Sequence, residues 1–243
     1  MRIVRTALAA AAILCASSVN AATIAVSTFD AGDYNSSFAV LGTTGEDFEA
    51  FGATFGEGEV GAVFSTAVGT FESLGGTGNG GAVTGSGTEL ALRDGSVYGR
   101  ANTVPTGGTW FLDSNDTWGM KWVVDIGSAF NKLSFVLNDG SDTGAFLRII
   151  AGGASEELRS GGQLANGNAR RVLVDFGQEV TTAEIILGNF TTSGGKNFRR
   201  NDGFSIDGIA VSAIPLPASV LLLGIAVGGL GWAGRRKARN SST

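Results

Sequence analysis

Carboxylates are the side chains of this chain that could do chemistry. The 243 residues include 22 Asp and Glu but no His, and the one Cys, Cys15, lies in an apolar stretch near the N-terminus. Without His, neither a Ser-His-Asp nor a Cys-His nucleophile can form, and zinc sites of the usual His/Cys type are excluded. The chain also has no GxxxxGK[ST] phosphate loop. A carboxylate pair of the glycosidase type is the catalytic arrangement that remains, and spacing alone does not locate it.

Three acidic clusters are candidate ligands for Ca²⁺. Calcium takes six to eight oxygen ligands, and turns rich in Asp and Asn supply carboxylates and free backbone carbonyls. None of the clusters has EF-hand spacing, and each could instead be an Asx turn between two strands. We therefore predict no required cofactor and leave calcium open. The candidate ligands are Asp113 and Asp116, Asp139 and Asp142, and Asp202 and Asp207.

Three tryptophans lie within thirteen residues, at Trp110, Trp118 and Trp122. An exposed indole could stack against a sugar ring, whereas a Trp on an alternating strand commonly packs into the core. Trp118 and Trp122 share the parity of neighbouring apolar residues, so we expect both in the core. Trp110 is left as the candidate for a sugar-binding site.

The elements that must position these side chains are strands, because apolar residues alternate with polar ones and no sustained helical period occurs. The alternating segments are Trp118 to Ile126, Leu133 to Leu137, Val172 to Phe176, and Ala183 to Leu187. Turn dipeptides such as Asp94-Gly95 and Asn166-Gly167 punctuate the chain. The pattern predicts one all-β domain over residues 22–213, an antiparallel β-sandwich or jelly roll.

The N-terminus has the three parts of a secretory signal peptide. Arg2 and Arg5 precede an apolar run from Thr6 to Ala16, and small residues then favour cleavage between Ala21 and Ala22. We therefore predict residues 1–21 as a signal peptide, with the secretion translocon and signal peptidase as partners. Cleavage would remove the one Cys, so no disulfide is expected in the mature protein.

The C-terminus, residues 214–243, has three parts in a fixed order. Pro215-Leu216-Pro217 breaks any preceding strand. Ala218 to Gly234 is an uncharged run of 17 residues, near the lower limit for a transmembrane helix. A basic cluster then predicts that the tail stays in the cytoplasm and the body lies outside. The cluster consists of Arg235, Arg236, Lys237 and Arg239.

The order of these parts resembles the PEP-CTERM class of sorting signals. The sequence from Ile214 to Ala218 is similar to the VPLPA-CTERM variant of this class. Residues 201–209 resemble the strand that often precedes such a signal. The resemblance implies an exosortase that recognises the tail and cuts near Pro-Leu-Pro. It also implies transient residence in the inner membrane, delivery to the cell surface or the medium, and a host that makes exopolysaccharide.

Charge is partitioned along the chain. Six of the 17 basic residues lie in the two terminal segments, so residues 22–213 carry 22 acidic and 11 basic side chains, a net charge of −11. Such a body argues against nucleic acid as a partner. We expect an exported, non-enzymatic envelope or matrix protein associated with exopolysaccharide or biofilm. The alternatives are a carbohydrate-binding module and a glycan-cleaving enzyme such as a glycoside hydrolase.

Overall fold

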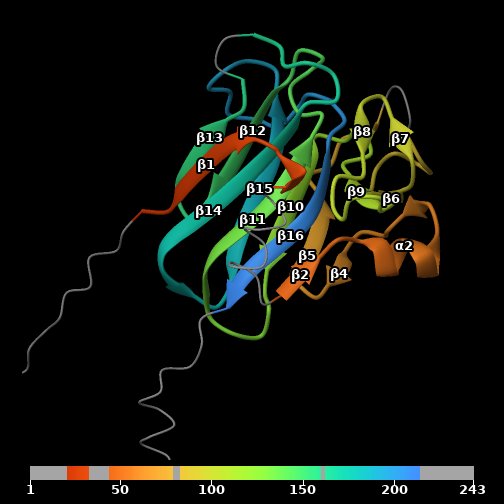
Figure 1. Cartoon of the computed structure of the whole chain (residues 1–243). Helices are drawn as coiled ribbons and strands as arrows, with labels where there is room; N and C mark the ends of the chain where they lie inside the picture. Colours follow the sequence, from red (N-terminus) through yellow and green to blue (C-terminus); the bar gives the residue numbers. More distant parts are fainter. Residues whose placement is uncertain (1–20, 33–43, 79–82, 160–161, 214–243) are drawn as a thin grey trace, which may run out of the picture.

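The alternating segments form the strands of two antiparallel β-sheets. The structure, a computed structural model, describes residues 21–32, 44–78, 83–159 and 162–213. Figure 1 shows the two sheets as layers of one body, with the short hairpin β7–β8 and the helix α2 (Glu49–Phe55) at one side. The predicted all-β, antiparallel fold is confirmed for the described residues.

The larger sheet has eight strands in the order β1-β14-β11-β16-β9-β6-β3, and β2 also pairs with β16. Its strands are β1 (Thr23–Thr28), β2 (Thr44–Glu46), β3 (Gly58–Glu59), β6 (Ala91–Arg93), β9 (Phe111–Asp113), β11 (Phe130–Asn138), β14 (Ala169–Val180) and β16 (Ser205–Ala213).

The smaller sheet has six strands in the order β13-β12-β15-β10-β5-β4. Its strands are β4 (Phe64–Thr66), β5 (Gly69–Ser73), β10 (Gly119–Val124), β12 (Phe146–Ala151), β13 (Ala154–Glu157) and β15 (Ala183–Phe190). A separate two-stranded hairpin consists of β7 (Ser96–Val97) and β8 (Arg100–Ala101).

The core lies between the inner faces of the two sheets. Trp122 of β10 stacks on Phe71 of β5, with ring centroids 5.4 Å apart, and meets Phe135 of β11 edge-on at 6.1 Å. All three side chains are fully buried. The indole N–H of Trp122 donates to the carbonyl of Val68 at 3.0 Å, so the large ring is buried without losing a hydrogen bond. The expectation that Trp122 belongs to the core is confirmed, whereas Trp118 is only partly buried.

Strand register brings several distant loops to the same end of the molecule. The first residue of β16, Ser205, pairs with both Asn138 and Asp113, which are the last residues of β11 and β9. Asn138 also pairs with Ala169 at the start of β14. In antiparallel pairs the end of one strand adjoins the start of its partner, so the loops after Asp113 and Asn138 meet the loops before Ala169 and Ser205.

Two predicted segments lie outside the described residues. They are the signal peptide up to residue 20 and the C-terminal signal, with its predicted transmembrane helix over 218–234. Within the described part of the chain, no helix is long and apolar enough to cross a membrane. The predicted cleavage bond between Ala21 and Ala22 directly precedes β1, and Ala22 already packs against the core.

Candidate binding pocket

The converging loops enclose a polar pocket of about 470 Å³, here called the loop-end pocket. Its volume falls in the range of small-molecule sites. Carboxylates, amides, guanidinium groups and one aromatic ring line it together. The lining residues are Tyr98, Arg100, Asp116, Asp139, Asp142, Thr143, Asn166, Arg200, Asn201, Asp202 and Gly203.

Hydrogen bonds between the loops hold the pocket in shape. Ser114 and Phe204 join the loop after β9 to the loop before β16, with the Ser114 N–H donating to the Phe204 carbonyl at 2.9 Å. The Asn201 side-chain amide donates to the carbonyl of Asp116 at 2.8 Å, across the same pair of loops. The backbone N–H of Ala101 donates to the Asn138 side chain at 3.1 Å, which fastens the β7–β8 hairpin to β11.

Asp139 lies beneath the tip of the hairpin. It is 3% exposed, and one carboxylate oxygen accepts a hydrogen bond from the backbone N–H of Gly167 at 2.6 Å. Burial raises the pKa of Asp139 to about 7, against the opposing effect of that N–H donor. A Cβ on Gly99 would come within 2.6 Å of the Asp139 carboxylate and 2.0 Å of the Asn166 side chain. The close approach of the hairpin therefore requires glycine at 99.

Asp142 and Asp202 come together from two different loops. Asp202 is 3% exposed, and one of its oxygens accepts a hydrogen bond from the Thr143 hydroxyl. Its other oxygen, Oδ2, is buried, and no donor in the described part of the chain reaches it. Burial raises the pKa of Asp202 to about 7, and the neighbouring Asp142 raises it further. Burial also raises the pKa of Asp142. A hydrogen bond between the two carboxyls opposes the rise for Asp142 and adds to the rise for Asp202, so the pair holds one proton more readily than an isolated carboxylate does. When both groups are ionised they repel each other.

Arg100 supplies a buried positive charge at the pocket wall. One guanidinium nitrogen is 2.7 Å from a carboxylate oxygen of Asp113, which is fully buried, and Arg93 lies 3.9 Å from the other oxygen. Burial raises the pKa of Asp113, and the two arginines oppose this effect. Asp113 therefore fixes Arg100 in position, and it does not line the pocket itself.

The sequence-predicted ligands divide into two groups. Each of the three predicted clusters contributes at least one residue to the loop-end pocket. These residues are Asp116, Asp139, Asp142 and Asp202. Asp207, which was grouped with Asp202, lies elsewhere. Its Oδ2 accepts hydrogen bonds from the backbone N–H groups of Thr103 at 2.7 Å and Val104 at 2.9 Å. Burial raises the pKa of Asp207 to about 7 against these donors.

Trp110, the predicted sugar-stacking candidate, lies beside α2. A Cβ added to Gly52 would come within 1.8 Å of its indole, so the ring packs directly on the helix. Its backbone N–H donates to the Glu49 carboxylate at 2.8 Å. Trp110 is partly buried against the core and is not among the residues that line the loop-end pocket.

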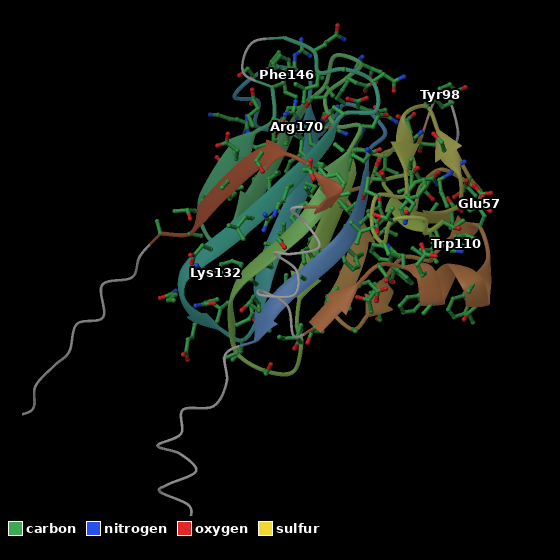
Figure 2. The ribbon with its side chains drawn as sticks, viewed as in Figure 1. Glu57, Tyr98, Trp110, Lys132, Phe146 and Arg170 are labelled. Carbon is green, nitrogen blue, oxygen red and sulfur yellow. The ribbon has the colours of Figure 1, made fainter. Side chains whose placement is uncertain are left out.

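Sequence reasoning did not single out Tyr98, Arg100, Asn166 or Arg200. Tyr98 is 67% exposed and has a positive φ of 49°, which is uncommon for a residue with a Cβ. Figure 2 shows Tyr98 at the tip of the β7–β8 hairpin, well separated from Trp110 beside α2. Tyr98 and Gly99 form the two-residue turn of this hairpin, and the glycine at its second position is a local signal that could have identified the turn.

In the described part of the chain, no three Asp, Glu, His or Cys side chains are already gathered closely enough to hold a metal ion among themselves. No family model matches the chain, and no curated protein matches it significantly.

Proposed function

We propose that this chain is an exported, non-enzymatic protein of the cell envelope or extracellular matrix. Its β-sandwich binds exopolysaccharide, and the loop-end pocket takes one or two sugar units of that polymer. The observation that carries the proposal is the composition of the pocket, in which fixed polar groups lie beside one exposed aromatic ring.

The polar groups suit a ligand with many hydroxyl groups. Carboxylates accept hydrogen bonds from hydroxyls, guanidinium groups donate to them, and the amide of Asn166 can do both. The groups are held by neighbouring loops, as with the Asp139 carboxylate on the Gly167 N–H. Fixed partners reduce the entropy lost when a ligand binds.

Tyr98 adds an apolar surface to these polar groups. The C–H face of a sugar ring is apolar and packs well on an aromatic face, while the phenol hydroxyl stays in water. With 67% of its surface exposed, Tyr98 has room for such a contact. Trp110 is not used in this proposal because its ring packs on α2 and does not line the pocket.

The termini supply the route to the envelope. The signal peptide would export the chain, and a transmembrane helix over 218–234 would hold it briefly in the inner membrane. The resemblance of the tail to PEP-CTERM signals supports processing by an exosortase, followed by display at the surface or release. An acidic body without nucleic-acid-binding character is compatible with that location.

The test uses exported protein recovered from its native host and polysaccharide isolated from the same cells. Tyr98→Ala and Asn166→Ala should each weaken retention on immobilised polysaccharide by about tenfold, equivalent to roughly 1.4 kcal/mol. Phe55→Ala is the matched control, because Phe55 is an exposed aromatic residue on α2 outside the pocket. Equal binding by the Tyr98 and Phe55 variants would contradict the proposal.

A glycan-cleaving enzyme is the second candidate, favoured by one observation. The pKa values of Asp139 and Asp202 are both raised to about 7, the range of an efficient general acid. Release of new reducing ends from the same polysaccharide, lost in Asp139→Asn, would replace the binding function with this one.

A further inference from the structure

We propose that the loop-end pocket holds a divalent cation of the calcium class, bound by the carboxylates of Asp142 and Asp202. This inference deepens the proposed function, on which its role in ligand binding rests. The two side chains belong to different clusters in the sequence, and the fold brings them into one site.

One carboxylate oxygen of the pocket, Oδ2 of Asp202, is buried with no hydrogen-bond donor among the described residues. Asp202 is 97% buried and lines the pocket, and its carboxyl interacts directly with that of Asp142. An unpartnered buried carboxylate oxygen is costly unless a positive charge or a donor compensates it. The backbone of Asp202 is fixed as well, because the amide of the fully buried Asn189 donates to the Asp202 carbonyl at 2.7 Å.

The side chains that line the pocket carry more negative than positive groups. Four carboxylates line it against two arginines. Arg100 already directs a guanidinium nitrogen to Asp113 at 2.7 Å, and the exposed Arg200 donates to the Thr143 carbonyl at 3.4 Å. These two contacts therefore go to Asp113 and to a backbone carbonyl, and neither goes to the carboxylate of Asp142 or Asp202. A divalent cation between the two carboxylates would neutralise their repulsion.

The type of ligand atom in the pocket determines which cation fits. All available ligands are oxygens, since the chain has no His and its one Cys is remote in sequence. Hard oxygen ligands select calcium or magnesium over zinc and copper. The ligands come from two loops and include neutral oxygens such as that of Thr143, an irregular set that suits the flexible coordination of calcium better than the strict octahedron of magnesium.

The affinity should be modest. No three acidic side chains of the described residues are gathered around one point, so water and neutral oxygens must complete the coordination sphere. Sites with few charged ligands in extracellular modules have Kd values of about 10⁻⁴ to 10⁻³ M. Coordination positions filled by water are also positions that sugar hydroxyls can take, which links the ion to the proposed ligand.

The experiment measures calcium binding directly, by calorimetry with CaCl₂ alone and by thermal melting, on exported protein freed of metal. At a tenfold excess over Kd, calcium should raise the melting temperature by about 3–6 °C. Asp202→Asn and Asp142→Asn should each weaken calcium binding at least tenfold. Asp125→Asn, which changes an exposed Asp in the loop between β10 and β11, should bind like wild type.

The melting temperature without calcium separates a cation site from a structural carboxylate. Asp202→Asn removes a repelling charge, so the metal-free variant should melt at or above the wild-type temperature while losing the calcium response. A variant that melts lower and keeps its calcium response overturns the inference. So does an absence of binding up to 10-fold above the expected Kd range, or magnesium binding as tight as calcium binding.

The outcomes also distinguish this inference from the function on which it rests. If polysaccharide binds without calcium and is unaffected by the Asp202 change, the cation site is wrong and the binding function stands. If calcium binds as predicted but no polysaccharide is retained, the function is wrong and the cation site stands.

Discussion

At the scale of single residues, the buried charges around Asp113 explain how the pocket obtains a positive group. The carboxylate is fully buried and contacts Arg100 closely and Arg93 more distantly. Desolvation cancels much of the attraction in such a pair, so its net contribution to stability is small. Removing one partner, however, leaves an uncompensated buried charge. The cluster therefore fixes the position of Arg100 more than it stabilises the fold.

Gly203 makes this arrangement possible, because an added Cβ would lie 2.4 Å from a guanidinium nitrogen of Arg100. We predict that Gly203→Ala displaces Arg100, leaves Asp113 poorly paired and lowers the free energy of unfolding by about 3 kcal/mol. Urea denaturation measures the change. Gly58→Ala is the control, since a methyl group there meets no atom of the described residues within 4 Å. Equal stability of the two variants would show that Arg100 can move without cost.

Asp207 holds the segment after β8 in place. Its Oδ2 accepts from Thr103, Val104 and the Asn102 amide, and its Oδ1 from the N–H of Gly208. We predict that Asp207→Ala leaves several buried donors unsatisfied and destabilises the protein by about 3 kcal/mol. Asp125→Ala, at an exposed turn position, should change stability by less than about 0.5 kcal/mol. A small effect at Asp207 in the same urea titration would mean that water replaces the carboxylate.

At the scale of elements, local pattern predicts strands but not their neighbours. The parity of Leu133, Phe135 and Leu137 placed all three in the core, as the structure confirms. The pairing of Ser205 with both Asn138 and Asp113 depends on contacts between residues far apart in sequence, which no local period encodes. For that reason the acidic clusters could be named from sequence, but their meeting in one pocket could not.

A titratable contact joins β12 and β13 at the edge of the smaller sheet. Glu157 accepts from Arg148 at 2.9 Å and from Ser193 at 2.7 Å. Burial alone raises the pKa of Glu157, but hydrogen bonds from Ser193, Arg148 and the Gly194 N–H outweigh it and leave the pKa below its ordinary value. The folded protein therefore binds fewer protons here than the unfolded chain. The stabilisation is present above the unfolded pKa, about 4.3, and is lost as the pH falls through the lower folded pKa.

The corresponding variant is Glu157→Gln. We predict that it is less stable than wild type by about 1 kcal/mol at pH 7, and that the difference closes as the pH falls below about 4. Melting temperatures across this pH range check the prediction. Glu156→Gln on the same strand is the control, because Glu156 is exposed. A difference that stays constant with pH would assign the effect to packing instead of charge.

At the scale of the whole molecule, charge and hydropathy differ between the acidic body and the two terminal segments, which are apolar and carry basic residues. Composition was enough to predict this division, since 11 basic residues face 22 acidic ones between residues 22 and 213. It was not enough to predict Tyr98 and Arg100 as pocket residues. Both owe their place to the packing of the β7–β8 hairpin over Asp139, which Gly99 permits.

The tail is the part of the molecule on which the proposed route to the envelope depends. Its 17-residue apolar run is near the minimum for a membrane span, so under the proposed route we expect brief residence in the membrane before cutting. Proline disfavours a helical conformation in the residue before it, so we expect Pro215 and Pro217 to favour an extended chain that a protease could reach. We predict that Pro215→Ala with Pro217→Ala leaves full-length protein in the inner membrane, as immunoblots of membrane fractions from the native host would show. Deleting residues 214–243 should instead send the body directly to the periplasm or medium. If the double-proline variant is cut and localised like wild type, the tail is an anchor without a sorting role.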